Sequence, residues 1–261
     1  IELDGVEKTF AVYRRAGRVR RRRTEVHAVD GVTFGIEAGS MVGYIGPNGA
    51  GKSTTIKMLI GILVPSAGRV RVDGRDPSRE RSEVARRIGV VFGQRTQLWW
   101  DLPLADSFDL LRHVYRVPAA DHRARLARLA DLLDVGGLLD TPVRQLSLGQ
   151  RMRGELVAAL LHDPPILFLD EPTIGLDLVS KEAVRGFLAE LNRERGTTVL
   201  LTTHDLVDVE RLCDRLLIID RGHVIEDGTV EAVKARFGAG GTLEDVVRRI
   251  YLDGTSAAPA Q

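Results

Sequence analysis

The stretch of sequence best suited to chemistry is a glycine-rich loop at residues 46–53, with the pattern Gly-x-x-x-x-Gly-Lys-Ser. Glycines let the backbone wrap closely enough for successive N–H groups to point at phosphate oxygens. Lys52 can reach the β- and γ-phosphates of a nucleotide, and the Ser53 hydroxyl can hold a magnesium ion. A buried strand is expected before the loop and a helix after it, which is the context a phosphate site requires. The loop predicts nucleotide binding, and the alternative is a glycine-rich turn without a ligand.

A second group of reactive side chains follows a run of four apolar residues. Asp170 ends this expected strand, and an acid in that place holds magnesium in phosphate-loop NTPases. The neighbouring Glu171 has a carboxylate that can polarise a water molecule for attack on the γ-phosphate. Gln94 and His204 each follow an expected strand as well. Because ligands of parallel sheets bind at the carboxyl ends of the strands, we expect these four side chains to lie near the nucleotide.

The elements that position these residues alternate between strands and helices, which predicts a largely parallel, covered sheet. Residues 1–10 alternate in the manner of an edge strand. The stretch at about 96–162 is helical in pattern and contains no strand-like run, so we expect a helical subdomain inserted into the core. The predicted fold is α/β: a phosphate-loop NTPase core with a mostly parallel sheet, an antiparallel β edge region and an inserted helical subdomain.

Composition narrows the classes of function. The 261 residues include 37 basic and 36 acidic side chains, a net charge of +1 that argues against a globally basic nucleic-acid binder. Cys213 is the only cysteine, so no internal disulfide is expected, which fits a reducing compartment. No apolar run approaches the ~18 residues that a membrane-spanning helix needs. We therefore expect a soluble chain, and another chain would have to supply any spanning helices.

The segment Arg14–Arg23 contains seven arginines and shows no periodicity, so we expect an exposed loop. The plainest interpretation is a solvated, charged hairpin tip. The alternatives are contact with anionic lipid headgroups or an acidic partner, and specific nucleic-acid binding.

Six features occur in one order along the chain, and this order is that of a known family. They are the loop at 46–53, Gln94, the stretch Leu146-Ser147-Leu148-Gly149-Gln150, the pair Asp170-Glu171, the stretch Gly175-Leu176-Asp177, and His204. The chain resembles the ATP-binding subunit of an ATP-binding cassette (ABC) transporter over about residues 1–235. The Leu-Ser-x-Gly-Gln signature is the most family-specific part. The resemblance implies an ATP-binding domain over 1–237. The residues beyond it predict a short helical and disordered extension over 238–261, in which the small and polar residues 254–261 are expected to be disordered.

The resemblance also implies an ATPase in which two subunits sandwich two ATP molecules head to tail. Each site would combine the phosphate loop of one subunit with Ser147 and Gly149 of the other. Glu171 matches the general base, His204 matches the residue that contacts the γ-phosphate and orients the water, and Asp177 matches the acid that communicates across the dimer. The implied nucleotide-binding residues are Phe10, Gly46, Pro47, Asn48, Gly49, Ala50, Gly51, Lys52, Ser53, Thr54, Gln94, Ser147, Gly149, Gln150 and Asp177. The implied magnesium shell is Ser53, Gln94 and Asp170.

Two details of this implied site stay open. Phe10 matches the aromatic residue that stacks on adenine, with Tyr13 as the substitute. The common signature is Leu-Ser-Gly-Gly-Gln, and Leu148 replaces its first glycine. A leucine still offers a backbone N–H but resists a positive φ, so we expect the γ-phosphate contact through Gly149 to persist with an altered geometry.

A dimer is also expected from the residues themselves. Ser147 is placed to cap the helix that follows it, and the N-terminus of that helix forms a second anion site. This second site is remote in sequence from the phosphate loop. A second subunit can bring the two together around one γ-phosphate.

The segments 91–103 and 171–177 resemble those of stand-alone ATPase subunits of bacterial exporters for drugs and other amphiphiles. The adjacent Trp99 and Trp100 are interpreted either as a socket for a cytoplasmic helix of a permease or as buried packing. The implied partners are a second ATP-binding subunit, most simply an identical one, and membrane-spanning permease subunits. The chain would then lie peripherally on the cytoplasmic side of the cell membrane.

Other classes of function fit the sequence less well. The alternative is a soluble ABC-type ATPase that acts on nucleic acid or ribosomes, but such proteins usually carry two cassettes or long coiled coils. This chain has one cassette and no sustained heptads. A regulatory ATP sensor without turnover is disfavoured by the intact Glu171 and His204. No nucleic-acid partner is expected.

Overall fold

The computed structural model describes residues 1–16, 20–93, 95–237 and 241–256. The chain divides into two compact units. The first comprises Ile1–Glu37, Val42–Val84 and Cys213–Gln261, and the second comprises Ala38–Met41 and Ala85–Leu212. Each unit is described by itself below. Gln94, which belongs to the predicted magnesium shell, lies outside the described residues.

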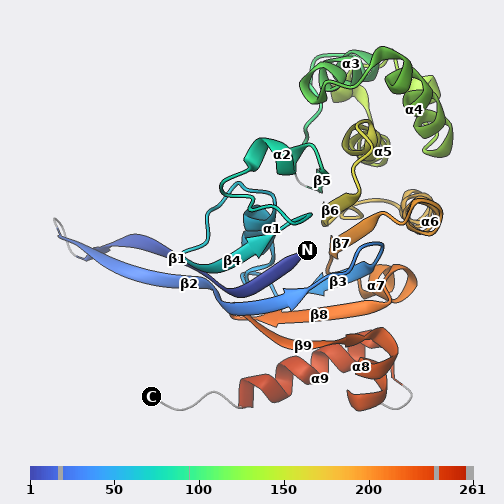
Figure 1. The fold of residues 1–261 in the computed structure, drawn as a ribbon. Helices are drawn as coiled ribbons and strands as arrows, with labels where there is room; N and C mark the ends of the chain where they lie inside the picture. The colour runs from blue at the N-terminus through green and yellow to red at the C-terminus, as the bar shows by residue number, and fades with distance from the viewer. Residues whose placement is uncertain (17–19, 94, 238–240, 257–261) are drawn as a thin grey trace. The chain divides into compact units, whose positions relative to one another are not determined.

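An antiparallel sheet in the first unit contains three strands in the order β2-β1-β4 (Figure 1). These are β1 (Glu2–Ala16), β2 (Arg20–Gly35) and β4 (Ala67–Arg71). The ladder between β1 and β2 continues well beyond the short β4, so the two strands extend as a long hairpin. The antiparallel region predicted from the sequence is therefore present.

Two expectations about this region are wrong. β1 is the central strand of its sheet and not an edge strand, because β2 and β4 pair with its two sides. Alternation reveals one buried face, but it cannot reveal a partner strand about 60 residues further along the chain. The expected arginine-rich loop is instead strand up to Ala16 and again from Arg20. An antiparallel ladder is held by backbone hydrogen bonds, so it needs no apolar periodicity to form.

The first unit also holds the strands and helix that flank the phosphate loop. β3 (Met41–Ile45) runs parallel to β8 (Arg215–Asp220), and the antiparallel β9 (His223–Thr229) pairs with β8. All five residues of β3 are buried. α1 (Lys52–Leu59) follows the loop and buries Ile56, Met58 and Leu59. The predicted order of strand, loop and helix is confirmed.

Two helices, α8 (Val230–Phe237) and α9 (Leu243–Ser256), follow β9 in the sequence and lie beside it (Figure 1). Four apolar residues of α9 are buried, namely Leu243, Val246, Val247 and Ile250. Residues 254–256 were expected to belong to a polar, disordered tail, and this expectation is wrong because α9 includes them. The buried apolar stripe anchors α9, and its final turn continues the same backbone hydrogen bonding.

The second unit contains a parallel sheet with three strands in register. β5 (Ile88–Phe92) pairs with β6 (Ile166–Asp170), which pairs with β7 (Thr198–Thr202). Phe92, Asp170 and Thr202 lie side by side in this register, so the carboxyl ends of the strands are aligned. α6 (Leu178–Arg195) follows β6, and α7 (Leu206–Leu212) follows β7. A mostly parallel sheet is confirmed.

Between β5 and β6, the described residues form helices and no strand, as predicted. The α-helices are α3 (Leu104–Tyr115), α4 (Ala119–Leu132) and α5 (Leu148–Leu160), with short 3₁₀ turns at 136–138 and 143–145. α5 is the best buried of the three, and nine of its residues are buried. It packs against α3, α4 and β5, which makes it the central helix of the second unit. One short helix, α2 (Arg81–Ala85), precedes β5.

Candidate functional site

The phosphate loop wraps around its own lysine. Lys52 Nζ donates hydrogen bonds to the carbonyl oxygens of Gly46, at 2.5 Å, and Pro47, at 3.2 Å. Gly51 caps α1 in the left-handed conformation, with φ 111°, and no side chain caps this helix. The dipole of α1 favours an anion at this end of the helix. The geometry provides a cradle of amides with an ammonium group beside it.

One side of the loop is held by buried residues, and the other side is exposed. Thr55 Oγ1 donates to the Gly51 carbonyl at 3.2 Å and lies 3.2 Å from the buried Tyr44 hydroxyl. Burial raises the pKa of Tyr44, so its hydroxyl stays protonated at neutral pH. Among the predicted nucleotide contacts, Thr54 is half-buried, Ala50 is buried, and Pro47, Asn48, Gly49 and Ser53 are exposed. A loop that is fixed on its buried side and exposed on the other suits a phosphate site.

The two aromatic candidates for stacking on adenine lie in β1. Phe10 is half-buried, and Lys8 Nζ lies 5.3 Å from its ring centroid. That spacing is within the range of a cation–π contact. The backbone of Tyr13 pairs with Arg23, whereas its side chain lies outside the described part of the structure. The assignment of Phe10 to adenine therefore stays a prediction.

In the second unit, three predicted residues come together at the carboxyl ends of β6 and β7. Glu171 Oε2 lies 2.7 Å from His204 Nδ1, and the His204 backbone N–H also points at Oε2, at 3.4 Å. Asp170 Oδ1 accepts a hydrogen bond of 2.6 Å from the Thr202 hydroxyl. With a proton on Nδ1, His204 donates to the carboxylate and fixes its orientation. The arrangement can hold a base in place for proton abstraction.

Glu171 has an unusual backbone. Its φ is 57°, in the left-handed region that costs a residue other than glycine about 1–3 kcal/mol. Three hydrogen bonds hold this conformation: Glu171 N–H to Thr202 O at 2.9 Å, Gly93 N–H to Asp170 O at 2.7 Å, and Ile174 N–H to Glu171 O at 3.3 Å. Strain that is held by the surrounding structure is typical of functional sites.

The signature stretch begins α5. Ser147 is the N-cap, and its Oγ accepts from the Gln150 N–H at 3.2 Å, while Gln150 Oε1 accepts from the Ser147 N–H at 2.9 Å. The predicted capping role of Ser147 is confirmed. Since a hydroxyl has one proton and two lone pairs, Ser147 can still donate to a phosphate oxygen. Gln150 works mainly as the reciprocal cap, so its contact with nucleotide stays a prediction.

The leucine in the signature fits without strain. Leu148 is the first residue of α5 and does not adopt a positive φ, so its expected conflict with the backbone does not arise. Its Cδ2 lies 2.8 Å from the position that a Cβ on Gly175 would take. The leucine side chain therefore fills the space that Gly175 leaves open.

The signature also lies against the beginning of α6. Asp177 caps α6, with Oδ1 accepting from the Ser180 N–H at 2.9 Å and Oδ2 from the Ser180 hydroxyl at 2.8 Å. These hydrogen bonds, first the backbone one, lower the pKa of Asp177. A Cβ on Gly149 would lie 2.5 Å from Ser180 Oγ, so only glycine allows this approach. Ser147 and Asp177 are therefore exposed residues that lie next to the buried Gly149, on one surface of the second unit.

The sequence interpretation missed a buried charge network beneath Glu171 and His204. Arg185 on α6 and Asp208 on α7 are both buried and lie 2.5 Å apart. Asp208 also accepts from the hydroxyls of Thr173, at 2.5 Å, and Thr203, at 3.3 Å. Thr173 and Thr203 belong to the loops that carry Glu171 and His204. The one available signal was a charged residue on the apolar side of each helix, which periodicity treats as noise.

Trp99 and Trp100 lie at the surface of the second unit and are 41% and 48% exposed. The Trp99 N–H donates to the buried Ser107 hydroxyl at 3.2 Å, which fixes the backbone below the rings. The Arg151 guanidinium lies 5.5 Å from the centroid of the Trp100 ring. Buried packing, one of the two interpretations of this pair, is therefore wrong.

Two further properties bear on function. Among the described residues, no three histidine, cysteine, aspartate or glutamate side chains gather in a way that would hold a metal. Ser53 and Asp170, the described members of the predicted magnesium shell, carry hard oxygen donors of the kind that suits Mg²⁺, and the shell stays a prediction. None of the described helices has the length and apolar character needed to cross a membrane.

Comparison with known proteins gives a consistent result. A family described as "ABC transporter" matches residues 29–174. The ABC transporter ATP-binding protein NatA of Bacillus subtilis (strain 168) is 35% identical over 216 residues, which cover 83% of this chain and 87% of NatA. The daunorubicin resistance ATP-binding protein DrrA3 of Streptomyces coeruleorubidus is 37% identical over 249 residues, which cover 95% of this chain and 73% of DrrA3.

Solved structures agree. The ATP-binding subunit of an ABC transporter superimposes with a TM-score of 0.81 at 28% identity, covering 96% of this chain and 98% of that one. A dimeric, post-hydrolysis ATP-binding cassette bound to ADP and Pi gives a TM-score of 0.74 at 27% identity, covering 87% of this chain and 97% of that one.

Proposed function

The chain belongs to the ABC transporter family as an ATP-binding subunit and ATPase, and from this premise we propose that it drives export of an amphiphilic substrate through separate permease subunits. The observation that carries the catalytic part of this proposal is the 2.7 Å contact between Glu171 and His204 beside Asp170. A carboxylate oriented by an imidazole at the end of a strand suits the activation of water.

In the proposed reaction, the loop at 46–53 binds the phosphates of ATP through its amides and Lys52. The Glu171 carboxylate accepts a proton from the attacking water. The oxygen of that water attacks the γ-phosphorus in line as the bond to ADP breaks. His204 holds the carboxylate through Nδ1, which leaves Nε2 to face the γ-phosphate. Ser53 and Asp170 would hold Mg²⁺, which when bound neutralises charge on the phosphate oxygens.

A second copy of the chain is the proposed source of the remaining contacts. Leu178 and Val179, directly after Asp177, are 72% and 79% exposed, which is unusual for adjacent aliphatic side chains on the surface of a monomer. They adjoin the surface formed by Ser147, Gly149 and Asp177. An ATP-bridged partner would cover this surface, and the solved cassette bound to ADP and Pi is a dimer. Closure on ATP and reopening after hydrolysis would then be the working cycle.

The exposed Trp99 and Trp100 are the proposed contact for a permease. Indole rings are enriched in protein interfaces because they bury a large area with little loss of conformational freedom. A permease would also hold the chain at the cytoplasmic side of the membrane. The arginine-rich segment, residues 14–23, would add contact with anionic lipid headgroups.

The direction of transport is inferred from relatives. Among proteins 37–39% identical to this chain are daunorubicin resistance and Nod factor export ATP-binding proteins. Methionine import ATP-binding proteins also match, at 34% and 37% identity, but over a smaller share of the chain. The greater coverage by the Nod factor export proteins, up to 90% of this chain, favours export.

Affinity capture of the tagged chain from detergent-solubilised membranes of its own cells tests the transporter function. We expect a membrane-spanning protein to be recovered with the wild-type chain and to be lost with Trp99→Ala/Trp100→Ala. Val114→Ala is a matched control, because Val114 on α3 is also an exposed apolar residue, at 63%. Recovery of the wild-type chain without any spanning partner would count against the proposal.

A further inference from the structure

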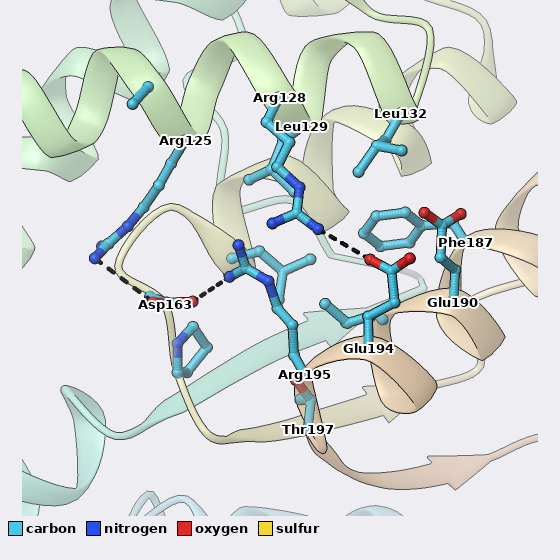
Figure 2. Close-up of a pocket in the computed structure, with 14 residues that line it drawn as sticks. Arg125, Arg128, Leu129, Leu132, Asp163, Phe187, Glu190, Glu194, Arg195 and Thr197 are labelled. Carbon is cyan, nitrogen blue, oxygen red and sulfur yellow. Dashed lines mark hydrogen bonds and ion pairs between the residues drawn. The ribbon is translucent and has the colours of Figure 1, made fainter.

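A cavity of about 190 Å³ lies in the second unit, between α4, α6 and the end of α5 (Figure 2). The large apolar side chains that line it are Leu129, Leu132, Leu160, Phe187 and Leu191. None of the residues assigned above to ATP lines it. Apolar cavities of ~150 Å³ accept a molecule the size of benzene. This cavity therefore has room for one substituted ring.

Charged side chains surround the opening in two groups, which differ in how well they are paired. In the first group, Asp163 pairs with both Arg195, at 2.5 Å, and Arg125, at 3.6 Å. In the second group, Arg128 contacts Glu194 at 3.2 Å. Figure 2 shows these contacts as dashed lines. The first group thus has an excess of positive charge, and its arginines are already engaged.

Glu190 completes the second group and differs from the other charged residues around the opening. It is half-buried, and within the described residues it makes no hydrogen bond or ion pair. Figure 2 shows its carboxylate beside the Phe187 ring, as expected for residues three apart on one helix face. With Glu194 one turn further on, this side of the opening has two carboxylates for one arginine. A cation here would pair with Glu190 and could lie over an aromatic ring.

We propose that this cavity binds a small lipophilic cation, with its ring among the leucines and its ammonium group against Glu190. An anion would meet two carboxylates on this side and would have to displace Asp163 from its arginines on the other. A neutral molecule would fill the cavity but leave Glu190 without a partner. The inference goes beyond the proposed function and concerns a site separate from the nucleotide. Because binding is measured without ATP, its failure would not bear on the ATPase.

The test compares three probes of nearly the same shape: 2-phenylethylammonium, 2-phenylethanol and phenylacetate. Each is titrated into the full chain while the methyl NMR signals of Leu129, Leu160 and Leu191 are recorded. We expect these signals to shift with all probes that bind, and the ammonium probe to bind most tightly. The expected difference from the alcohol is about threefold to fivefold, as for a partly exposed ion pair.

Three variants sharpen the test. Glu190→Gln should bring the affinity for the ammonium probe down to that for the alcohol, whereas Glu231→Gln, on α8 of the other unit, should leave it unchanged. Ala124 lines the cavity and is exposed, so Ala124→Trp should block the opening without unfolding the chain. Equal binding of the ammonium and alcohol probes would overturn the proposal, as would leucine signals that do not shift at any soluble concentration.

Discussion

The Glu171–His204 pair illustrates what single residues contribute to this site. The sequence predicted the place of both residues because each follows a strand at the sheet edge where ligands bind, whereas the role of His204 was implied by the family resemblance. It did not predict the left-handed backbone of Glu171, which is held by hydrogen bonds with Thr202 and Gly93 from other segments and by the local turn to Ile174. Local sequence rules disfavour a positive φ for glutamate, so only the tertiary structure reveals it.

The approach of Gly149 to Ser180 gives a prediction at this scale. Gly149→Ala places a methyl group 2.5 Å from Ser180 Oγ, so it should push the signature away from Asp177 and lower the ATPase rate by about tenfold or more. Ser180→Ala removes the clashing oxygen and should have a small effect alone. The double variant should regain most of the rate in a steady-state ATPase assay. A double variant as slow as Gly149→Ala would contradict this explanation.

His162 should make stability depend on pH. Burial lowers the pKa of His162 to about 4, with its Nε2 donating to the Ile88 carbonyl at 2.9 Å and its ring stacked on Tyr115 at 3.9 Å. The unfolded chain binds a proton near the ordinary pKa of 6.5, whereas the folded chain resists protonation until pH 4. His162 therefore contributes up to about 3 kcal/mol to the free energy of unfolding. This contribution is complete above pH 6.5 and is lost as pH falls to 4.

Urea unfolding at a series of pH values between 4 and 7.5 measures this loss. His162→Phe keeps a ring on Tyr115 but cannot titrate, so its free energy of unfolding should fall less steeply below pH 6.5 than that of the wild type. Parallel curves for the two proteins would show that His162 is not the responsible group.

At the scale of elements, α6 and α7 are joined by charges that the apolar pattern could not reveal. Asp208 is fully buried and accepts from Arg185, Thr173 and Thr203. Apolar periodicity correctly predicted alternating strands and helices, with a buried strand before the phosphate loop (β3) and another that ends at Asp170 (β6). It failed for the arginine-rich ends of β1 and β2, where backbone pairing continues although the sequence shows no apolar periodicity.

Removing one partner of this network should lower the stability of the fold. Asp208→Ala leaves Arg185 buried beside Glu182, its partner at 2.9 Å, so the free energy of unfolding should fall by about 3 kcal/mol, the low end for a broken buried pair. Arg185→Met/Asp208→Leu removes both charges and should be more stable than Asp208→Ala. Urea unfolding of the variants gives both values. A double variant less stable than the single one would contradict this account.

At the scale of the whole molecule, the sequence predicted the fold class and the family because its motifs occur in a fixed order with little local ambiguity. The division into compact units could not be predicted, since it depends on which segments pack together. α5, for example, packs against β5 although the two are more than 50 residues apart. The cavity beside Glu190 is likewise formed by three helices, and no local pattern marks it.

The central claim is that ATP joins two copies of the chain through the surface at Ser147, Gly149 and Asp177, and that Glu171 then drives hydrolysis. Light scattering after gel filtration of Glu171→Gln with ATP and Mg²⁺ tests it most directly. We expect a dimer that forms only with ATP, an ATPase rate at least about 100-fold below wild type, and a monomer when Ser147→Arg is added. A Glu171→Gln chain that stays monomeric with ATP, or hydrolyses ATP as fast as the wild type, would contradict the account.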